Sequence, residues 1–378
     1  MAKNICLTIL GVLAWTVTLD STARSTRPSS QQNPAAGAPF ALALAPRAWQ
    51  FPRDHGQHPE FRTEWWYFTG NLHSADGRAF GYHFTIFRNA LTPVAANRPS
   101  AWAFRDAYVG HFALTDIARQ RFHYDQRVAR AALQLAGASQ DSLQVFVGDW
   151  SAWQVRHHLH VRAASSFGSI AFRLEPTLPP VLQGNGGLSQ KGPQPGEASF
   201  YYSLPMLHTE GRLTLGSDTL QVSGVSWMDH EFFTGVDASE VAGWDWFSLH
   251  LSDSTALMLY RLRRADGTLS RYSAGALIRS AGSVERIAFG EFQASPGGWW
   301  RSAKSDGDYP LAWRLRFQDY ELTVTTPVAG QELDTRATTG VIYWEGYVEA
   351  TGGRAGRPIT GRGYLEMTGY VAAARPRL

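Results

Sequence analysis

The chain has 378 residues, of which 44% are hydrophobic, 18% charged and 13% aromatic, with 14 tryptophans among them. This length allows two domains, and the composition is that of a globular protein rather than a disordered one. The formal net charge of +3, without a dense basic stripe, argues against binding to nucleic acid.

Residues 1–23 are typical of a secretory signal peptide. Lys3 supplies the positive charge, residues 5–19 form an apolar stretch, and Ser21, Thr22 and Ala23 resemble a cleavage site. The stretch is shorter than the roughly 20 residues of a membrane span. We expect a secreted or periplasmic protein, with an uncleaved membrane anchor as the alternative. The single cysteine, Cys6, lies inside this segment, so the mature chain has no disulfide, thiolate metal site or cysteine nucleophile.

The rest of the chain predicts an all-β fold with two domains. Residues 24–46 are rich in Ser, Gln, Pro and Ala and predict a flexible linker. Short aromatic or β-branched segments separated by turn residues then follow every 8–12 residues or so, which is typical of sandwiches and barrels. We expect an N-terminal domain at 47–233 and a C-terminal domain at 234–378. Residues 129–135 are a candidate short helix, and residues 176–197 read as a long loop.

A weak internal duplication accompanies this pattern. The aromatic run at residues 65–68 can be aligned with residues 244–247, and Glu210-Gly211 with Glu345-Gly346. An acid stands five residues after a glycine in both halves, as Asp229 after Gly224 and as Glu366 after Gly361. The repeat predicts two antiparallel barrels in tandem. It also allows a structural rather than a catalytic role for Asp229.

The segment around Asp229 is the main candidate site. In a strand, Asp229 and Glu231 share one face with Trp227, whereas His230 points to the other face. A buried carboxyl group needs a partner or a function. An acid in an aromatic pocket can stay protonated and act as a general acid, while a second carboxylate or His230 holds water.

Two further segments extend this candidate site. Asp245 lies between Trp244 and Trp246, and tryptophan faces can stabilise a developing cation. We therefore name Asp229, His230, Glu231 and Asp245 as catalytic candidates. Glu64 opens an aromatic strand in which it shares a face with Trp66, and Tyr67 lies on the other. The candidates for substrate binding are Trp227, Trp244, Trp246, Glu64, Trp66, Tyr67 and His83. The alternative for the acids is a structural network of backbone or arginine hydrogen bonds.

Other chemistries find little support in the sequence. The histidines and acids lack the spacing of a zinc site, and neighbouring strand residues point to opposite faces. A Gly-x-Ser-x-Gly elbow and a phosphate-binding glycine loop are both missing from the sequence. We therefore expect no metal and no cofactor.

Five segments together resemble the signature blocks of the CrtC/AttH-like family. They are residues 64–72 (EWWYFTGNL), 227–231 (WMDHE), 243–247 (GWDWF), 343–346 (YWEG) and 363–370 (GYLEMTGY). The resemblance implies two tandem lipocalin-like (calycin) β-barrels. The family includes carotenoid 1,2-hydratases, which add water to an isoprenoid double bond without a cofactor, and a secreted branch labelled as predicted hydrolases. By resemblance, Asp229, His230, Trp244 and Asp245 would carry such chemistry.

From the residues and the resemblance we expect a protein that binds an apolar, isoprenoid or lipid-like ligand. Cofactor-free hydration or hydrolysis is the expected activity, and a non-catalytic carrier of such a ligand in the cell envelope is the alternative. The sequence decides neither whether the protein also makes a peripheral contact with a membrane nor what its oligomeric state is.

Overall fold

The computed structural model describes residues 39–93, 100, 102–235 and 241–374. The expected signal peptide and most of the expected linker lie outside these residues. Ala38–Leu378 form one compact unit, so the expected boundary between residues 233 and 234 stays a prediction. None of the described helices has both the length and the apolar character needed to span a membrane.

The first of two antiparallel sheets contains 13 strands within the described residues. The strands are β1 (Thr63–Ser74), β2 (Ala79–Ala90), β3 (Asp106–Asp116), β4 (Arg121–Arg130), β5 (Ala136–Ala138), β6 (Gln144–Val147), β7 (Trp150–Val155), β8 (His158–Ser165), β9 (Gly168–Pro176), β10 (Val181–Leu182), β11 (Leu188–Gln190), β12 (Ala198–Leu215) and β13 (Asp218–Phe233). Their order is β4-β3-β2-β1-β13-β12-β9-β8-β7-β6-β5, with β10 and β11 beside β12. Because the edge strands β4 and β5 contact each other, this sheet is barrel-shaped.

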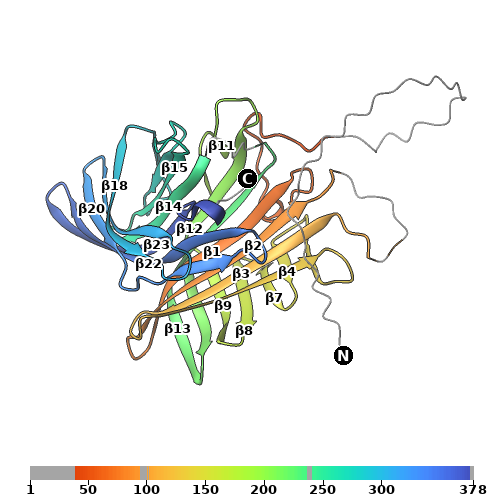
Figure 1. The fold of residues 1–378 in the computed structure, drawn as a ribbon, viewed down its shortest axis with the longest axis horizontal. Coiled ribbons are helices and arrows are strands. Elements are labelled where there is room, and N and C mark those ends of the chain that lie inside the picture. Colours follow the sequence, from red (N-terminus) through yellow and green to blue (C-terminus); the bar gives the residue numbers. More distant parts are fainter. Residues whose placement is uncertain (1–38, 94–99, 101, 236–240, 375–378) are drawn as a thin grey trace, which may run out of the picture. The chain divides into compact units, whose positions relative to one another are not determined.

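The second sheet contains ten strands within the described residues. They are β14 (Val241–Leu251), β15 (Ala256–Arg264), β16 (Ala274–Ile278), β17 (Val284–Ile287), β18 (Phe292–Arg301), β19 (Asp308–Phe317), β20 (Tyr320–Thr325), β21 (Glu332–Thr335), β22 (Val341–Arg354) and β23 (Arg357–Thr368). Their order is β17-β16-β15-β14-β23-β22-β20-β19-β18, with β21 beside β22. Two short 3-10 helices, η1 (Arg53–His55) and η2 (Ala372–Ala374), complete the described elements. Figure 1 shows the first sheet in orange to green and the second in teal to blue.

The prediction is an all-β fold with two tandem lipocalin-like β-barrels. The lipocalin-like all-β fold with two sheets is confirmed, and one of the sheets is barrel-shaped. Each sheet has its own apolar core. Trp66, Phe68 and Phe84 belong to the core of the first sheet, and Phe247 and Trp313 to that of the second. Strand alternation explains why these residues point inward while their neighbours point outward.

Strand registers support the internal duplication. Gly224 pairs with Leu72 across β13 and β1, and Gly361 pairs with Leu251 across β23 and β14. Five residues further on, Asp229 pairs with Tyr67, and Glu366 pairs with Trp246.

The proposed match of Glu210-Gly211 with Glu345-Gly346 is wrong. Gly211 lies opposite Val222, which stands two residues before Gly224. The equivalent residue two positions before Gly361 is Ile359, and it lies opposite Gly352 rather than Gly346. Gly211 and Gly352 both have φ near +150°, at 151° and 158°, and a Cβ atom at either would collide with a neighbouring carbonyl oxygen.

Two local expectations also need correction. Residues 129–135 do not form a helix, because β4 continues to Arg130 and a turn follows in which Leu133 and Gln134 have φ of 55° and 56°. The long loop at 176–197 contains β10 and β11, which add to the edge of β12. This pairing holds the loop against the first sheet and brings Lys191 towards β13.

The outer faces of the two sheets pack on each other through a third apolar cluster. Tyr67 and Trp227 of the first sheet meet Trp246 and Tyr364 of the second in this cluster. Asn71 Nδ2 donates a hydrogen bond of 3.1 Å to the carbonyl oxygen of Gly363. At Gly81 a Cβ atom would lie 2.5 Å from Tyr364 Oη, so glycine permits the close approach.

Candidate functional site

A cavity of about 400 Å³ lies between the outer faces of the two sheets. It is therefore outside both sheet interiors, which side chains fill. Strands from both halves and the 176–197 segment contribute its lining, whose polar members include Tyr67, His83, His111, Lys191, Tyr201, Asp229, Glu231, Tyr343, Glu345 and Glu366. Its volume suits a small organic ligand.

Asp229 is the cavity acid with the most hydrogen bonds. Ser203 Oγ and Trp227 Nε1 donate to Asp229 Oδ1 at 2.5 and 2.7 Å, and Tyr201 Oη donates to Oδ2 at 2.6 Å. Burial raises the pKa of Asp229 to about 7, although these hydrogen bonds act in the opposite direction. Asp229 can thus hold a proton near neutral pH. Trp227 is buried behind it and does not line the cavity.

Glu366 is the counterpart of Asp229 in the second sheet and lines the same cavity. Burial raises the pKa of Glu366 to about 7, a hydrogen bond from Trp244 lowers it, and the charges of Asp229 and Glu231 raise it further. Glu345, on the neighbouring strand, has a pKa well above its usual value because of burial and the nearby Glu366 charge. The two glutamates were not among the predicted site residues, although the repeat pointed to Glu366.

Glu231 has a cationic partner that the sequence did not reveal. Lys191 Nζ lies 3.2 Å from Glu231 Oε1, and Ser199 Oγ donates to the same oxygen. Lys191 also lies over the ring of Tyr260, 4.4 Å from its centroid. Burial lowers the pKa of Lys191, but the Glu231 charge outweighs it and keeps the amine protonated. The charges of Lys191 and Glu231 therefore neutralise each other within the cavity wall.

Aromatic rings form much of the remaining wall. Trp65, Tyr67, Trp244 and Trp246 all line the cavity, and within each strand these residues share one face by alternation. Tyr67 and Trp246 come from different sheets, and their ring centroids lie 5.1 Å apart in an edge-to-face arrangement. Such walls hold apolar ligands and can stabilise a cation.

The predicted residues on the opposite strand faces lie elsewhere. Glu64, Trp66 and His230 point into the first sheet, where Glu64 Oε1 lies 2.9 Å from His230 Nε2. Arg88 Nε donates to Glu64 Oε2 at 3.0 Å, and both side chains are fully buried. Burial raises the pKa of Glu64, but Arg88, His230 and His58 together hold it well below its usual value. This arrangement is a closed structural network rather than a ligand site.

Asp245 is also separated from the cavity. Tyr370 Oη donates to Asp245 Oδ1 at 2.8 Å, while Arg263 Nε and Arg261 Nε lie 3.2 and 3.8 Å from Oδ2. Trp244 and Trp246 line the cavity, and Asp245, which lies between them, points to the other face of β14. These contacts match the alternative expectation for the acids, in which a carboxylate is held by arginines in a structural network.

One group in the described residues has the spacing of metal ligands, namely His58, Glu64 and His230. Glu64 Oε1 already contacts His58 Nδ1 and His230 Nε2 at 2.9 Å each. A metal ion would have to displace these contacts beside the Arg88 guanidinium. The residues therefore fit a hydrogen-bonded network better than a cation site.

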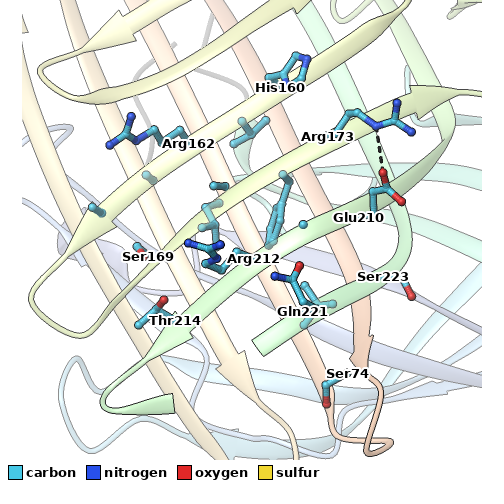
Figure 2. Close-up of a pocket in the computed structure, with 18 of the residues that line it drawn as sticks. Ser74, His160, Arg162, Ser169, Arg173, Glu210, Arg212, Thr214, Gln221 and Ser223 are labelled. Carbon is cyan, nitrogen blue, oxygen red and sulfur yellow. Dashed lines mark hydrogen bonds and ion pairs between the residues drawn. The ribbon is translucent and has the colours of Figure 1, made fainter. Parts of the chain in front are cut away.

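A larger hollow of about 1090 Å³ lies on the first sheet, over β8, β9, β12 and β13. Figure 2 shows Arg162, Arg173 and Arg212 on neighbouring strands, with Arg173 linked to Glu210. Arg162 and Arg212 are exposed, whereas Arg173 is partly buried and its Nε lies 3.1 Å from Glu210 Oε1. The hollow lacks the buried acids of the inter-sheet cavity, so the latter is the candidate site.

The chain matches the family model described as AttH-like over residues 42–370. It belongs to the AttH-like family. A candidate AttH protein from Nitrosomonas europaea, solved as a crystal structure, shares 34% identity with a TM-score of 0.78, over 88% of this chain and 100% of that one. No sequence among the curated proteins matches.

Kievitone hydratase from Nectria haematococca has a similar structure, with a TM-score of 0.66 over 87% of this chain and 94% of that one. The sequence identity is 16%, so the similarity establishes a shared fold. The AttH-like fold of this chain is thus also the fold of a hydratase.

Proposed function

We propose that this protein binds an apolar, isoprenoid or lipid-like ligand in the inter-sheet cavity and adds water to one of its carbon–carbon double bonds. The observation that carries the proposal is the pair Asp229 and Glu366, two acids with pKa values near 7 in one aromatic cavity. Similarity of fold to a hydratase adds support. Hydrolysis by general acid–base catalysis could use the same two acids, and the similarity of fold to a hydratase favours hydration.

Glu366 is the better proton donor of the pair. Both oxygens of Asp229 accept hydrogen bonds from the protein, which favours its carboxylate form. Glu366 has fewer partners and keeps part of its surface open to the cavity. Two neighbouring carboxylates repel each other, so Asp229 and Glu366 do not readily ionise together. At neutral pH the two acids therefore share at least one proton.

The reaction then balances without a cofactor. Glu366 transfers its proton to one alkene carbon, and the new C–H bond leaves a cation on the other carbon. The faces of Trp244 and Trp246 stabilise that cation. A water oxygen forms the C–O bond, and the proton released from water returns to the Asp229–Glu366 pair.

A direct test uses farnesol, an apolar alcohol with trisubstituted double bonds, in water labelled with oxygen-18. Mass spectrometry should show a product that has gained one labelled water with the wild-type protein. Glu366→Gln and Asp229→Asn should lower its rate by about 100-fold or more, as expected for loss of general acid catalysis. Wild-type protein that binds farnesol without forming this product would contradict hydration and support the carrier alternative.

A further inference from the structure

Three buried polar atoms in the cavity wall make no well-aligned hydrogen bond within the described residues, although Tyr67 and Glu345 lie near enough to interact. They are Tyr67 Oη, His83 Nδ1 and Glu345 Oε1. The side chains come from β1, β2 and β22, and their residues are only 7%, 2% and 1% exposed. Buried polar groups are nearly always paired, so these three atoms mark a place in the cavity where a ligand or water can supply the missing partner.

The three groups lie close together. His83 Nδ1 is 3.2 Å from Glu345 Oε2, although the two atoms lack the alignment of a hydrogen bond. The rings of Tyr67 and His83 have centroids 5.5 Å apart. The other nitrogen of His83 is 2.7 Å from Thr85 Oγ1, which fixes the ring with Nδ1 beside Glu345 in the cavity wall.

Some other unpaired atoms in the described structure have a local explanation. Asp245 Oδ2, Arg261 Nε and Arg263 Nε belong to one cluster of ion pairs. By contrast, Tyr343 lines the same cavity as Tyr67, and its hydroxyl is 2.8 Å from His111 Nδ1. Among the cavity's polar side chains, Tyr67, His83 and Glu345 therefore contact one another but lack a well-aligned partner for these atoms outside their group.

The group offers hydrogen bonds but little charge. Burial lowers the pKa of His83 well below its usual value, so the imidazole is neutral. Burial, together with Glu366, raises the pKa of Glu345, and burial also raises that of Tyr67. Lys191 is the only Lys or Arg among the described lining residues, and Glu231 neutralises it. A ligand anion would lose its hydration here without gaining a free cation.

We propose that Tyr67, His83 and Glu345 form a recognition subsite for an uncharged hydroxyl or carbonyl oxygen of the ligand. The ligand is then an oxygenated apolar molecule rather than a pure hydrocarbon. Its oxygen receives hydrogen bonds from this subsite, and its hydrocarbon part lies against Trp65 and Trp244. The inference rests on the proposed ligand-binding function of the cavity.

The test compares three ligands with the same carbon skeleton: farnesol, farnesene and farnesoic acid. Their dissociation constants can be measured by quenching of tryptophan fluorescence at neutral pH. Wild-type protein should bind farnesol about tenfold or more tightly than farnesene, since the hydrocarbon leaves the polar atoms unpaired. It should also prefer farnesol to farnesoic acid.

Tyr67→Phe and Glu345→Gln should each reduce the preference for farnesol over farnesene several-fold. Tyr272→Phe is the control, because it removes a tyrosine hydroxyl that does not line the cavity, and it should keep the wild-type preference. Thermal melting curves of each variant show whether it is folded, and the two variants provide independent readouts.

Equal wild-type affinity for farnesol and farnesene would overturn the subsite while leaving the ligand cavity and hydration intact. Tighter binding of farnesoic acid would overturn the uncharged ligand class. Failure of all three ligands to bind would overturn the apolar ligand and the subsite together. Absence of hydration despite selective binding would overturn the proposed reaction only.

Discussion

Asp229 and Glu366 occupy equivalent positions in the two sheets and face the same cavity. Each acid stands five residues after a glycine, and each pairs with an aromatic residue of the neighbouring strand, Tyr67 or Trp246. These aromatic partners contact each other across the interface. A duplicated structural feature has thus brought two acids into one apolar space, where burial favours their protonated forms.

The first prediction concerns stability and pH. The pKa of Glu366 is raised from 4.5 to about 7, so the folded state binds more protons than the unfolded state within this range. Its contribution therefore makes the protein less stable as pH rises from about 4.5 to 7. Glu366→Gln should remove this loss of stability. The loss amounts to about 2 kcal/mol of the free energy of unfolding between pH 5 and pH 8, reduced because Glu366 is partly exposed. Urea unfolding at both pH values measures the effect, and the exposed Glu60→Gln should leave the pH dependence unchanged.

The second prediction separates the acids that the sequence grouped together. Asp245→Asn removes a charge that faces Arg261 and Arg263, and it should lower the free energy of unfolding by about 3 kcal/mol because a buried ion pair loses one partner. It should leave the affinity for farnesol within about twofold, since Asp245 does not line the cavity.

Asp229→Asn should instead abolish hydration while the ligand still binds. Measurements of unfolding, binding and turnover on both variants make the comparison. Loss of turnover in a folded Asp245→Asn protein would place Asp245 in the reaction after all.

The third prediction concerns the network inside the first sheet. Arg88→Met leaves the buried carboxylates of Glu64 and Asp106 without their guanidinium partner. Such a loss should reduce the free energy of unfolding by about 3–5 kcal/mol. Arg162→Met, on an exposed position of β8, should change it by less than about 0.5 kcal/mol. Chemical denaturation gives the free energy of unfolding of both variants. Similar values for the two would contradict a stabilising role of the network around Arg88.

Much of the fold and part of the site could be predicted from periodicity. Alternation placed Asp229 and Glu231 on one strand face and His230 on the other, and it separated Trp65 and Tyr67 from Glu64 and Trp66. Periodicity could not say which face borders the cavity. Both faces of these strands are buried, one against a sheet core and the other against the second sheet.

The remaining site residues depend on long-range contacts. Lys191 comes from a Gly- and Pro-rich segment whose sequence does not predict the short strand pairs that hold it. Glu345 and Tyr67 meet only because the two sheets pack together. Asp245 was predicted from its tryptophan neighbours, but alternation turns it away from them towards Arg261 and Arg263.

The protonation of the cavity acids is the central claim, and it can be measured without knowing the natural ligand. Carbon-13 NMR of protein labelled at the Asp and Glu carboxyl carbons follows each group through a pH titration. We expect carboxyl signals that titrate near pH 7, and we expect one of them to disappear in Glu366→Gln while the signal of Asp229 shifts to lower pH. If every carboxyl group of the folded wild-type protein titrates below about pH 5, within the ordinary range, the cavity holds no acid able to protonate a double bond.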